Sequence, residues 1–327
     1  MASKEDLSIA IDLGGTKIRV AVIDRAGVLV QREDEPTLAH LGKDQTVDRL
    51  IQIITRLVTS TSGRTLVGIG ASLAGPVDPD TATMHGPPNL PGWDGFSIKP
   101  LLEDAFGIPM WAVNDATLGA VGEHAYGIGR GVQNLVYVTV STGVGGGIIQ
   151  DGKPLLGARG FAGEIGHMSI DRNGPMCPCG NMGCLETLTS GTAIARLALE
   201  RLERGGESIL QEAMNEDPAR VNARAVMEAA GLGDSLARSL VDQFARDLGL
   251  GLANLMHIFD PQMIILGGGV SQSYETYSAA LDAAIRSNVM AHLREHINVV
   301  TSVLGDDVSL LGAAHLAFQR GGRDEPG

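Results

Sequence analysis

The chain has 327 residues, of which 44% are hydrophobic and 19% are charged, and its formal net charge is −13. This composition is typical of a folded globular protein, and the length suggests about two domains. The acidic balance argues against nucleic acid and anionic membranes as main partners, because both attract basic surfaces.

The first predicted element is a β-hairpin with a glycine-rich tip. Two runs rich in β-branched residues flank the turn Gly14-Gly15-Thr16-Lys17. The pattern of apolar residues then predicts a helix over 44–59, a buried strand over 65–72, a strand over 108–114 that runs out at Asn114-Asp115, and a helix over 116–125.

A second hairpin is expected over 134–152, and its sequence resembles that of the first. Setting Asp12 on Ser141 and Gly14 on Gly143 aligns the two, so we expect two similar halves. The chain is then mostly helical, before a strand that ends in Gly267-Gly268-Gly269, a helix near 272–287 and a last helix near 309–319. Strands that alternate with helices predict an α/β fold.

Three glycine-rich turns, each after an apolar strand, favour a nucleotide over ligand-free turns at a sheet edge, because glycine lets backbone amides approach phosphate oxygens. The chain lacks both the P-loop motif and the dinucleotide-binding motif. Asp12 offers a carboxylate for Mg²⁺, directly or through water. The residues predicted to bind the nucleotide and its metal are Asp12, Gly14, Gly15, Thr16, Lys17, Thr142, Gly143, Gly268 and Gly269.

All three cysteines lie in one short segment, "CPCGNMGC". His167, Cys177, Cys179 and Cys184 offer three sulfurs and one nitrogen, which is a complete tetrahedral ligand set for structural Zn²⁺. The alternatives are a redox pair and incidental buried thiols. The N-terminal residues lack a signal peptide pattern, so we expect a reducing, cytoplasmic location in which a structural disulfide is disfavoured.

The most specific resemblance begins in this region. "GEIGHM" and "CPCGNMGCLE", together with "IDLGGTKIRVAVID", "VNDATLGAVGE", "STGVGGGI" and "DPQMIILGGGV", resemble the ROK family of bacterial repressors and sugar kinases over nearly the whole chain. The resemblance implies two RNase-H-like domains of the actin/hexokinase ATPase superfamily, with an active-site cleft between them. We expect a smaller domain of residues 1–115 plus the C-terminal helix at about 309–327, and a larger one of residues 116–308.

The resemblance also implies the chemistry, which is ATP-dependent phosphorylation of a hexose, most like that of a glucokinase. Asp115 would be the base; taken alone, an Asp there is more often a helix N-cap. ATP, Mg²⁺ and structural Zn²⁺ are the implied cofactors, and relatives are commonly dimers or tetramers. The implied sugar-binding residues are Asn89, Asn114, Asp115, Glu164, His167 and Glu186.

Several alternatives remain open. Kinases of N-acetylmannosamine, N-acetylglucosamine or fructose would use nearly the same residues, and departures from the family pattern at Ala74 and Thr117-Leu118 leave the substrate preference open. A repressor would carry a helix-turn-helix domain, for which we expect no room before the hairpin at Leu7. A sugar sensor without activity is disfavoured by Asp12 and Asp115. A zinc hydrolase is disfavoured because four protein ligands leave no position for water.

Overall fold

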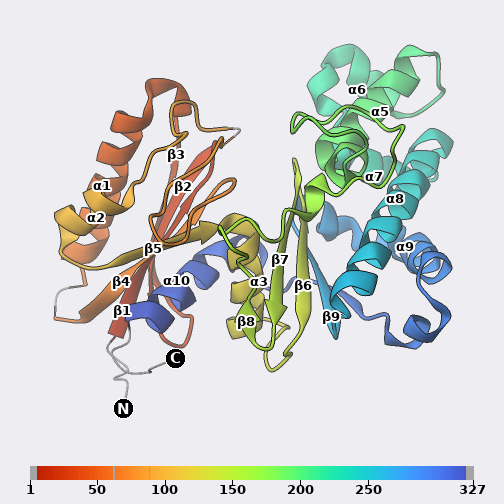
Figure 1. Ribbon diagram of the computed structural model, residues 1–327. Coiled ribbons are helices and arrows are strands. Elements are labelled where there is room, and N and C mark those ends of the chain that lie inside the picture. Colours follow the sequence, from red (N-terminus) through yellow and green to blue (C-terminus); the bar gives the residue numbers. More distant parts are fainter. Residues whose placement is uncertain (1–5, 62, 88, 322–327) are drawn as a thin grey trace. The chain divides into compact units, whose positions relative to one another are not determined.

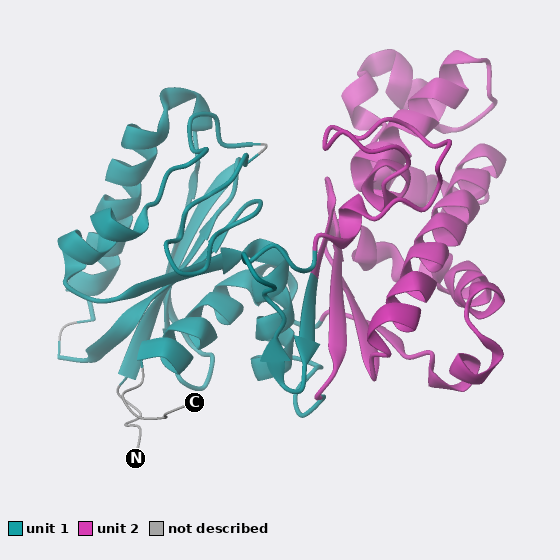
Figure 2. Ribbon diagram, in the orientation of Figure 1, with its two compact units in different colours: residues 1–132, 147–163, 303–327 teal, residues 133–146, 164–302 magenta. Residues whose placement is uncertain are grey.

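The computed structural model describes residues 6–61, 63–87 and 89–321 (Figure 1). The chain divides into two compact units (Figure 2). Unit 1 comprises residues 1–132, 147–163 and 303–327, and unit 2 comprises residues 133–146 and 164–302. The domain boundaries expected from the sequence stay a prediction.

Unit 1 is built on a five-stranded sheet with the order β3-β2-β1-β4-β5. The first three strands are antiparallel neighbours, whereas β1, β4 and β5 are parallel, so the carboxyl ends of these three strands lie at one edge. The strand bounds are β1 (Asp6–Leu13), β2 (Lys17–Asp24), β3 (Leu29–Pro36), β4 (Thr65–Leu73) and β5 (Met110–Asn114).

Helices cover both faces of this sheet (Figure 1). They are α1 (Lys43–Thr59) and α2 (Lys99–Phe106) on one face, and α3 (Asp115–Tyr126) and α10 (Val308–Gly321) on the other. Helix α1 buries Val47, Leu50, Ile54 and Leu57, which recur at helical spacing and explain why this segment packs on β2 and β3. Helix α10 contacts α3 and four strands of the sheet.

The second sheet repeats the plan of the first. Its order is β10-β9-β6-β7-β8, with β6, β9 and β10 parallel, and β7 and β8 antiparallel. In each sheet the central strand, β1 or β6, has parallel strands on one side. On its other side lies the second strand of its own glycine-tipped hairpin, β2 or β7. This shared order confirms the predicted internal repeat. The bounds are β6 (Leu135–Val140), β7 (Val144–Gln150), β8 (Lys153–Pro154), β9 (Met263–Gly267) and β10 (Val299–Thr301).

The helices of unit 2 pack around α8 (Ser235–Phe259), which contacts α4, α5, α7 and α9. The bounds of the other helices of this unit are α4 (Leu185–Thr189), α5 (Gly191–Glu203), α6 (Leu210–Glu216), which contacts α5 and α7, α7 (Ala223–Gly231) and α9 (Tyr274–Asn288). Short 3₁₀ turns are η1 (Ala39–Leu41), η2 (Ile165–His167), η3 (Pro218–Arg220), η4 (Gly269–Ser273), η5 (Ala291–His296) and η6 (Gly305–Asp307). Among the described helices, none has the length and apolar character needed to cross a membrane.

Candidate functional site

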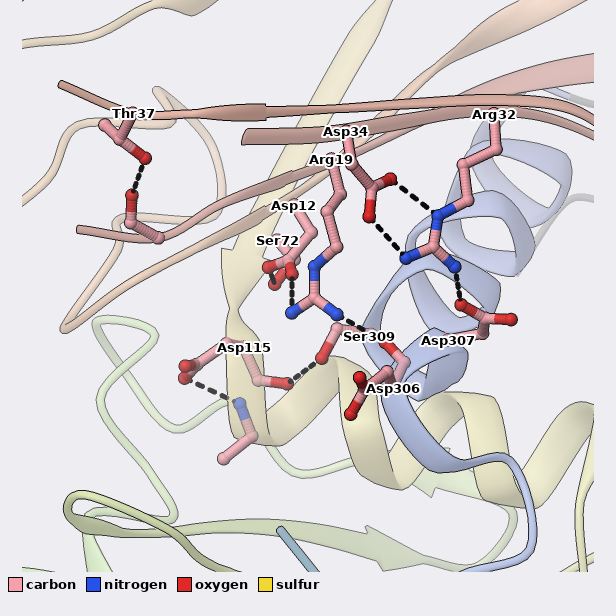
Figure 3. Close-up of polar contacts among 12 residues, drawn as sticks. Asp12, Arg19, Arg32, Asp34, Thr37, Ser72, Asp115, Asp306, Asp307 and Ser309 are labelled. Atoms are coloured by element: carbon pink, nitrogen blue, oxygen red, sulfur yellow. Dashed lines mark hydrogen bonds and ion pairs between the residues drawn. The ribbon is translucent and has the colours of Figure 1, made fainter. Parts of the chain in front are cut away.

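A row of polar side chains crosses the apolar sheet of unit 1. In the strand register Ser72 lies opposite Asp12, Asp12 opposite Arg19, and Arg19 opposite Asp34. Residues directly opposite one another in neighbouring strands share a face of the sheet, so these four form one line across β4, β1, β2 and β3 (Figure 3). The predicted metal-binding carboxylate, Asp12, lies in the middle of this line.

Both oxygens of the Asp12 carboxylate have partners. The Ser72 hydroxyl donates to Oδ1 at 2.9 Å, and an Arg19 guanidinium nitrogen lies 2.6 Å from Oδ2. Burial raises the pKa of Asp12, and the Arg19 cation and the Ser72 hydroxyl oppose that rise. Each carboxylate oxygen has two lone pairs, so the side chain can still accept a water ligand of a hydrated Mg²⁺ ion.

The turn after β1 carries four of the residues predicted to bind nucleotide. Gly14 N–H donates to Lys17 O at 3.0 Å, which closes the turn, and the side chains of Thr16 and Lys17 are exposed. The buried Thr37 makes two hydrogen bonds to the turn: its hydroxyl donates to Gly14 O at 2.6 Å, and its N–H donates to Thr16 O at 2.8 Å. The turn is therefore held at both ends by one residue of the chain.

Gly15 brings this turn against a second predicted residue. A Cβ at Gly15 would collide with the Asn89 side chain and would lie 2.8 Å from the Asn89 carbonyl oxygen. Only a residue without a side chain fits this approach. The structure thus puts Asn89, which is predicted to bind sugar, beside the turn predicted to bind phosphate.

Asp115 is the first residue of α3, directly after β5. Its side chain is exposed, and Oδ1 accepts the Ala116 N–H at 2.8 Å. The side chain lies at the positive end of the dipole of α3. Figure 3 shows Asp115 at the same edge of the sheet as Asp12.

The N-cap of α3 is Asn114 and not Asp115. The Asn114 Oδ1 atom accepts the N–H groups of Ala116 and Thr117, and its Nδ2 donates to Gly75 O at 3.0 Å. Asn114 therefore fixes both the start of α3 and the loop after β4. Because the capping is done by its neighbour, the interpretation of Asp115 as the N-cap is wrong.

Four side chains of unit 2 converge as the cysteine spacing predicts. The ligand atoms of His167, Cys177, Cys179 and Cys184 all lie within 4.8 Å of one another. Cys177 Sγ is 3.7 Å from His167 Nδ1, and Cys179 Sγ is 3.6 Å from Cys184 Sγ. Zinc bonds of about 2.0–2.3 Å in a tetrahedron require ligand atoms roughly 3.5–4 Å apart, so these four residues fit Zn²⁺.

The protein environment alone leaves the three thiols in different states. Burial raises the pKa of the Cys184 thiol to about 12 and also raises that of Cys177, whereas the Asn181 N–H lowers the pKa of Cys179 to about 7. A coordinated cation would hold all three as thiolates. Gly180 and Gly183, both with positive φ, supply the bends that bring the sulfurs together.

The two ring nitrogens of His167 face different partners. Nδ1 points to the sulfurs, and Nε2 lies 4.0 Å from Oε2 of Glu164. Burial raises the pKa of Glu164; the His167 ring opposes the rise and the Glu186 carboxylate adds to it. Three of the residues predicted to bind sugar thus lie together beside the sulfur cluster.

Glu186 belongs to α4, which begins directly after Cys184. Its Oε2 accepts the Val144 N–H at 2.8 Å, and a Cβ at Gly143 would collide with the same oxygen. Each glycine-rich hairpin therefore packs its tip against a residue predicted to bind sugar: Asn89 in unit 1, and Glu186 in unit 2. The third glycine turn is also tightly built, because Gly268 has a φ of +82° and lies against Val140 O, while Gly269 faces open space.

A family model described as "ROK family" matches residues 8–320. The chain belongs to the ROK family. A glucokinase of Halalkalibacterium halodurans is 34% identical over 323 residues, which cover 98% of this chain and 97% of that protein. A crystal structure described as a ROK family glucokinase from Streptomyces griseus, in complex with glucose and AMPPNP, is 33% identical, covers 96% of this chain and 99% of that chain, and superposes with a TM-score of 0.81.

ROK proteins also include regulators. The xylose repressor of Bacillus subtilis is 29% identical over 318 residues, which are 96% of this chain and 78% of the repressor. As a ROK protein, the chain has the two-domain actin/hexokinase-like fold, so the predicted fold class is confirmed.

Sequence reasoning missed the residues that hold the predicted ones in place. Arg19, Thr37, Ser72 and Thr192 were not singled out. Arg19 could have been found, because a tight turn at 14–17 fixes the hairpin register and so puts Arg19 opposite Asp12. The other three contact residues that are far from them in the sequence, so no local pattern reveals these contacts. The Thr192 hydroxyl, for example, donates to Thr142 O at 2.7 Å.

Proposed function

We propose that this ROK protein is an ATP-dependent hexose kinase, with glucose as the preferred acceptor and Asp115 as the base. The observation that carries the proposal is the position of Asp115. Asp115 begins α3 at the edge of the sheet where the parallel strands β1, β4 and β5 end. Asp12 and its glycine turn lie at the same edge. Open α/β sheets bind their ligands at this edge.

In unit 1, the nucleotide phosphates would be received by the turn that Thr37 and Asn89 hold. The backbone N–H groups of Gly15 and Thr16 and the exposed Thr16 and Lys17 side chains are suited to phosphate oxygens, while the Gly14 N–H closes the turn. Asp12 would bind a water ligand of Mg²⁺, and this ion, when bound, neutralises charge on the transferring phosphoryl group. Asn89 and Asn114 would border the sugar in this unit.

In unit 2, the sugar would be held by Glu164, His167 and Glu186. A sugar hydroxyl is both donor and acceptor, and carboxylates and imidazole offer complementary partners. His167 Nδ1 faces the sulfurs, so zinc would fix the tautomer with Nε2–H available to a hydroxyl. The zinc would therefore shape the sugar site and activate no water, because four protein ligands complete its coordination. Thr142, Gly143, Gly268 and Gly269 would take the remaining nucleotide contacts.

The Asp115 carboxylate would accept the proton of the sugar hydroxyl that attacks the γ-phosphate. The Ala116 N–H at Oδ1 fixes the plane of the carboxylate, so that it can orient this hydroxyl before transfer. Phosphoryl transfer passes through a loose transition state, so orientation contributes much of the effect of the base.

The decisive experiment is turnover by the Asp115→Asn variant with ATP and glucose. The amide keeps the shape but cannot accept the proton, so we expect kcat to fall by about 10²–10⁴-fold while glucose and AMPPNP still bind. Asp44→Asn is the matched control, because Asp44 is also an exposed acid in the first turn of a unit 1 helix. Near-normal kcat for Asp115→Asn would contradict the assignment.

The acceptor itself is tested with a substrate panel. Glucose, N-acetylmannosamine, N-acetylglucosamine and fructose are compared by kcat/KM with ATP, and we expect glucose to rank first. The glucokinases at 34% and 33% identity support this order. Sugar binding without turnover by the wild-type chain on any of these acceptors would instead favour a sugar-responsive regulator, the role in which the xylose repressor is named.

We also propose that the enzyme is a cytoplasmic homodimer or homotetramer. The domains would comprise residues 1–115 with about 309–327, and residues 116–308. Light scattering on the purified chain tests the oligomeric state, and limited proteolysis tests the boundary.

A further inference from the structure

The hairpin tip Ser141–Val144 is held by three contacts within unit 2. Glu186 Oε2 accepts the Val144 N–H, Gly191 N–H donates to Ser141 O at 2.7 Å, and the Thr192 hydroxyl donates to Thr142 O at 2.7 Å. Two of these contacts come from the start of α5, one from the Gly191 backbone and one from the short Thr192 side chain. The third comes from a side chain that the proposed function assigns to the sugar.

We propose that Glu186 couples the two ligands: its carboxylate holds the tip Ser141–Val144 in phosphate-binding shape while it binds a sugar hydroxyl, so that sugar and nucleotide each raise the affinity of the other. The proposal rests on the proposed function, because that function makes Glu186 a sugar ligand. It adds a link between the sites that lies within unit 2.

The geometry permits both bonds at once. A carboxylate has about four lone-pair positions, so the bond from Val144 N–H leaves acceptor capacity for a hydroxyl. The approach is also close, because any side chain at Gly143 would collide with Glu186 Oε2. A shift of the Glu186 carboxylate toward or away from the sugar therefore changes its contacts with Gly143 and Val144 in the tip.

The start of α4 restricts the backbone of Glu186. Cys184 is a member of the sulfur cluster, and Leu185 N–H donates to Met168 O at 2.9 Å. The backbone does not restrict the torsions of the long Glu186 side chain, and ordering them fully costs conformational entropy. Whichever ligand binds first pays that cost, so the second binds about tenfold more tightly.

The coupling is measured by titration calorimetry with glucose, with and without saturating Mg²⁺ and AMPPNP. We expect the nucleotide analogue to tighten glucose binding by about tenfold in the wild-type chain, and by less than about twofold in Gly143→Ala, whose Cβ displaces the carboxylate. Glu186→Asp keeps the charge but shortens the reach, so the coupling should be lost there too. Circular dichroism checks that each variant is folded.

Two control variants separate this link from general damage. Gly231→Ala adds a methyl group where no atom lies within 4 Å, so its coupling should equal that of the wild type. Thr192→Val removes the hydroxyl that donates to Thr142 O and leaves Glu186 in place. It should weaken AMPPNP binding on its own and still show the tenfold coupling.

Hydrogen exchange of the Val144 amide gives a second readout. Glucose alone should slow this exchange in the wild-type chain but not in Gly143→Ala or Glu186→Asp. Undiminished coupling in both variants would overturn the inference, because the link would then lie elsewhere. Wild-type binding of both ligands without coupling would overturn it and leave the kinase proposal intact, whereas failure of glucose and AMPPNP to bind at all would remove both.

Discussion

Thr37→Val is the sharpest test of how the first glycine turn is held. Thr37 is fully buried, its hydroxyl donates to Gly14 O at 2.6 Å, and valine has nearly the same shape. The variant keeps the Thr37 N–H bond to Thr16 O, so only the hydroxyl contact is removed.

The size of the effect follows from these contacts. A hydroxyl–carbonyl hydrogen bond contributes about 1 kcal/mol net, and leaving the half-buried Gly14 carbonyl without this donor adds to the loss. We expect the free energy of unfolding to fall by about 1.5–2 kcal/mol. Because the turn then samples other shapes, AMPPNP binding should weaken by about 5–10-fold, which corresponds to about 1–1.4 kcal/mol.

Thr46→Val is the matched control. Thr46 is also buried in unit 1, and its hydroxyl donates to Gly42 O at 3.0 Å, a carbonyl that the Thr46 N–H also contacts. Urea unfolding should show a loss of about 0.5–1 kcal/mol, with AMPPNP affinity unchanged. If calorimetry gives equal AMPPNP affinity for Thr37→Val and the wild type, the turn is not the phosphate site that we infer.

Three further outcomes are expected. Cys184→Ser should reduce bound zinc from about one ion per chain to nearly none by mass spectrometry and lower Tm, and full zinc content would exclude Cys184 as a ligand. Arg19→Met and Asp12→Asn should show a coupling of at least about 1 kcal/mol in a double-mutant cycle of urea unfolding, whereas additive losses would mean that the pair contributes nothing. Burial, helped by the charge of His124, lowers the pKa of His315 to about 4 from its ordinary 6.5, so the folded state resists protonation. The contribution of neutral His315 to the free energy of unfolding is then fully present above about pH 6.5 and falls as the pH drops toward 4. We expect the free energy of unfolding to be about 2 kcal/mol lower at pH 5, and to depend less on pH in His315→Gln.

Much of the fold follows from local patterns in the chain. The apolar runs and glycine tips of the two hairpins predict that the two halves share an arrangement of strands. The two sheets indeed have corresponding strand orders. The zinc ligands are close in sequence, so three thiols and one imidazole could be grouped without a structure, and the structure brings them within 4.8 Å.

The supporting contacts could not be predicted because they join residues far apart in the chain. Ser72 reaches Asp12 across 60 positions, and Val144 reaches Glu186 across 42. Asn114 and Asp115 show a different limit. Both are suited to an N-cap by residue type, and only the backbone decided that Asn114 caps α3 and that Asp115 begins it.

The last helix has a consequence for how this protein is made. Helix α10 lies on the sheet that begins at the N-terminus, yet 194 positions separate the end of β5 at Asn114 from the start of α10 at Val308. At about 5–20 residues per second, a ribosome needs roughly 10–40 s to make that stretch. Throughout this time α3 alone covers part of this apolar sheet face, and the area that α10 later covers stays open to chaperones, so the last helix completes the N-terminal half.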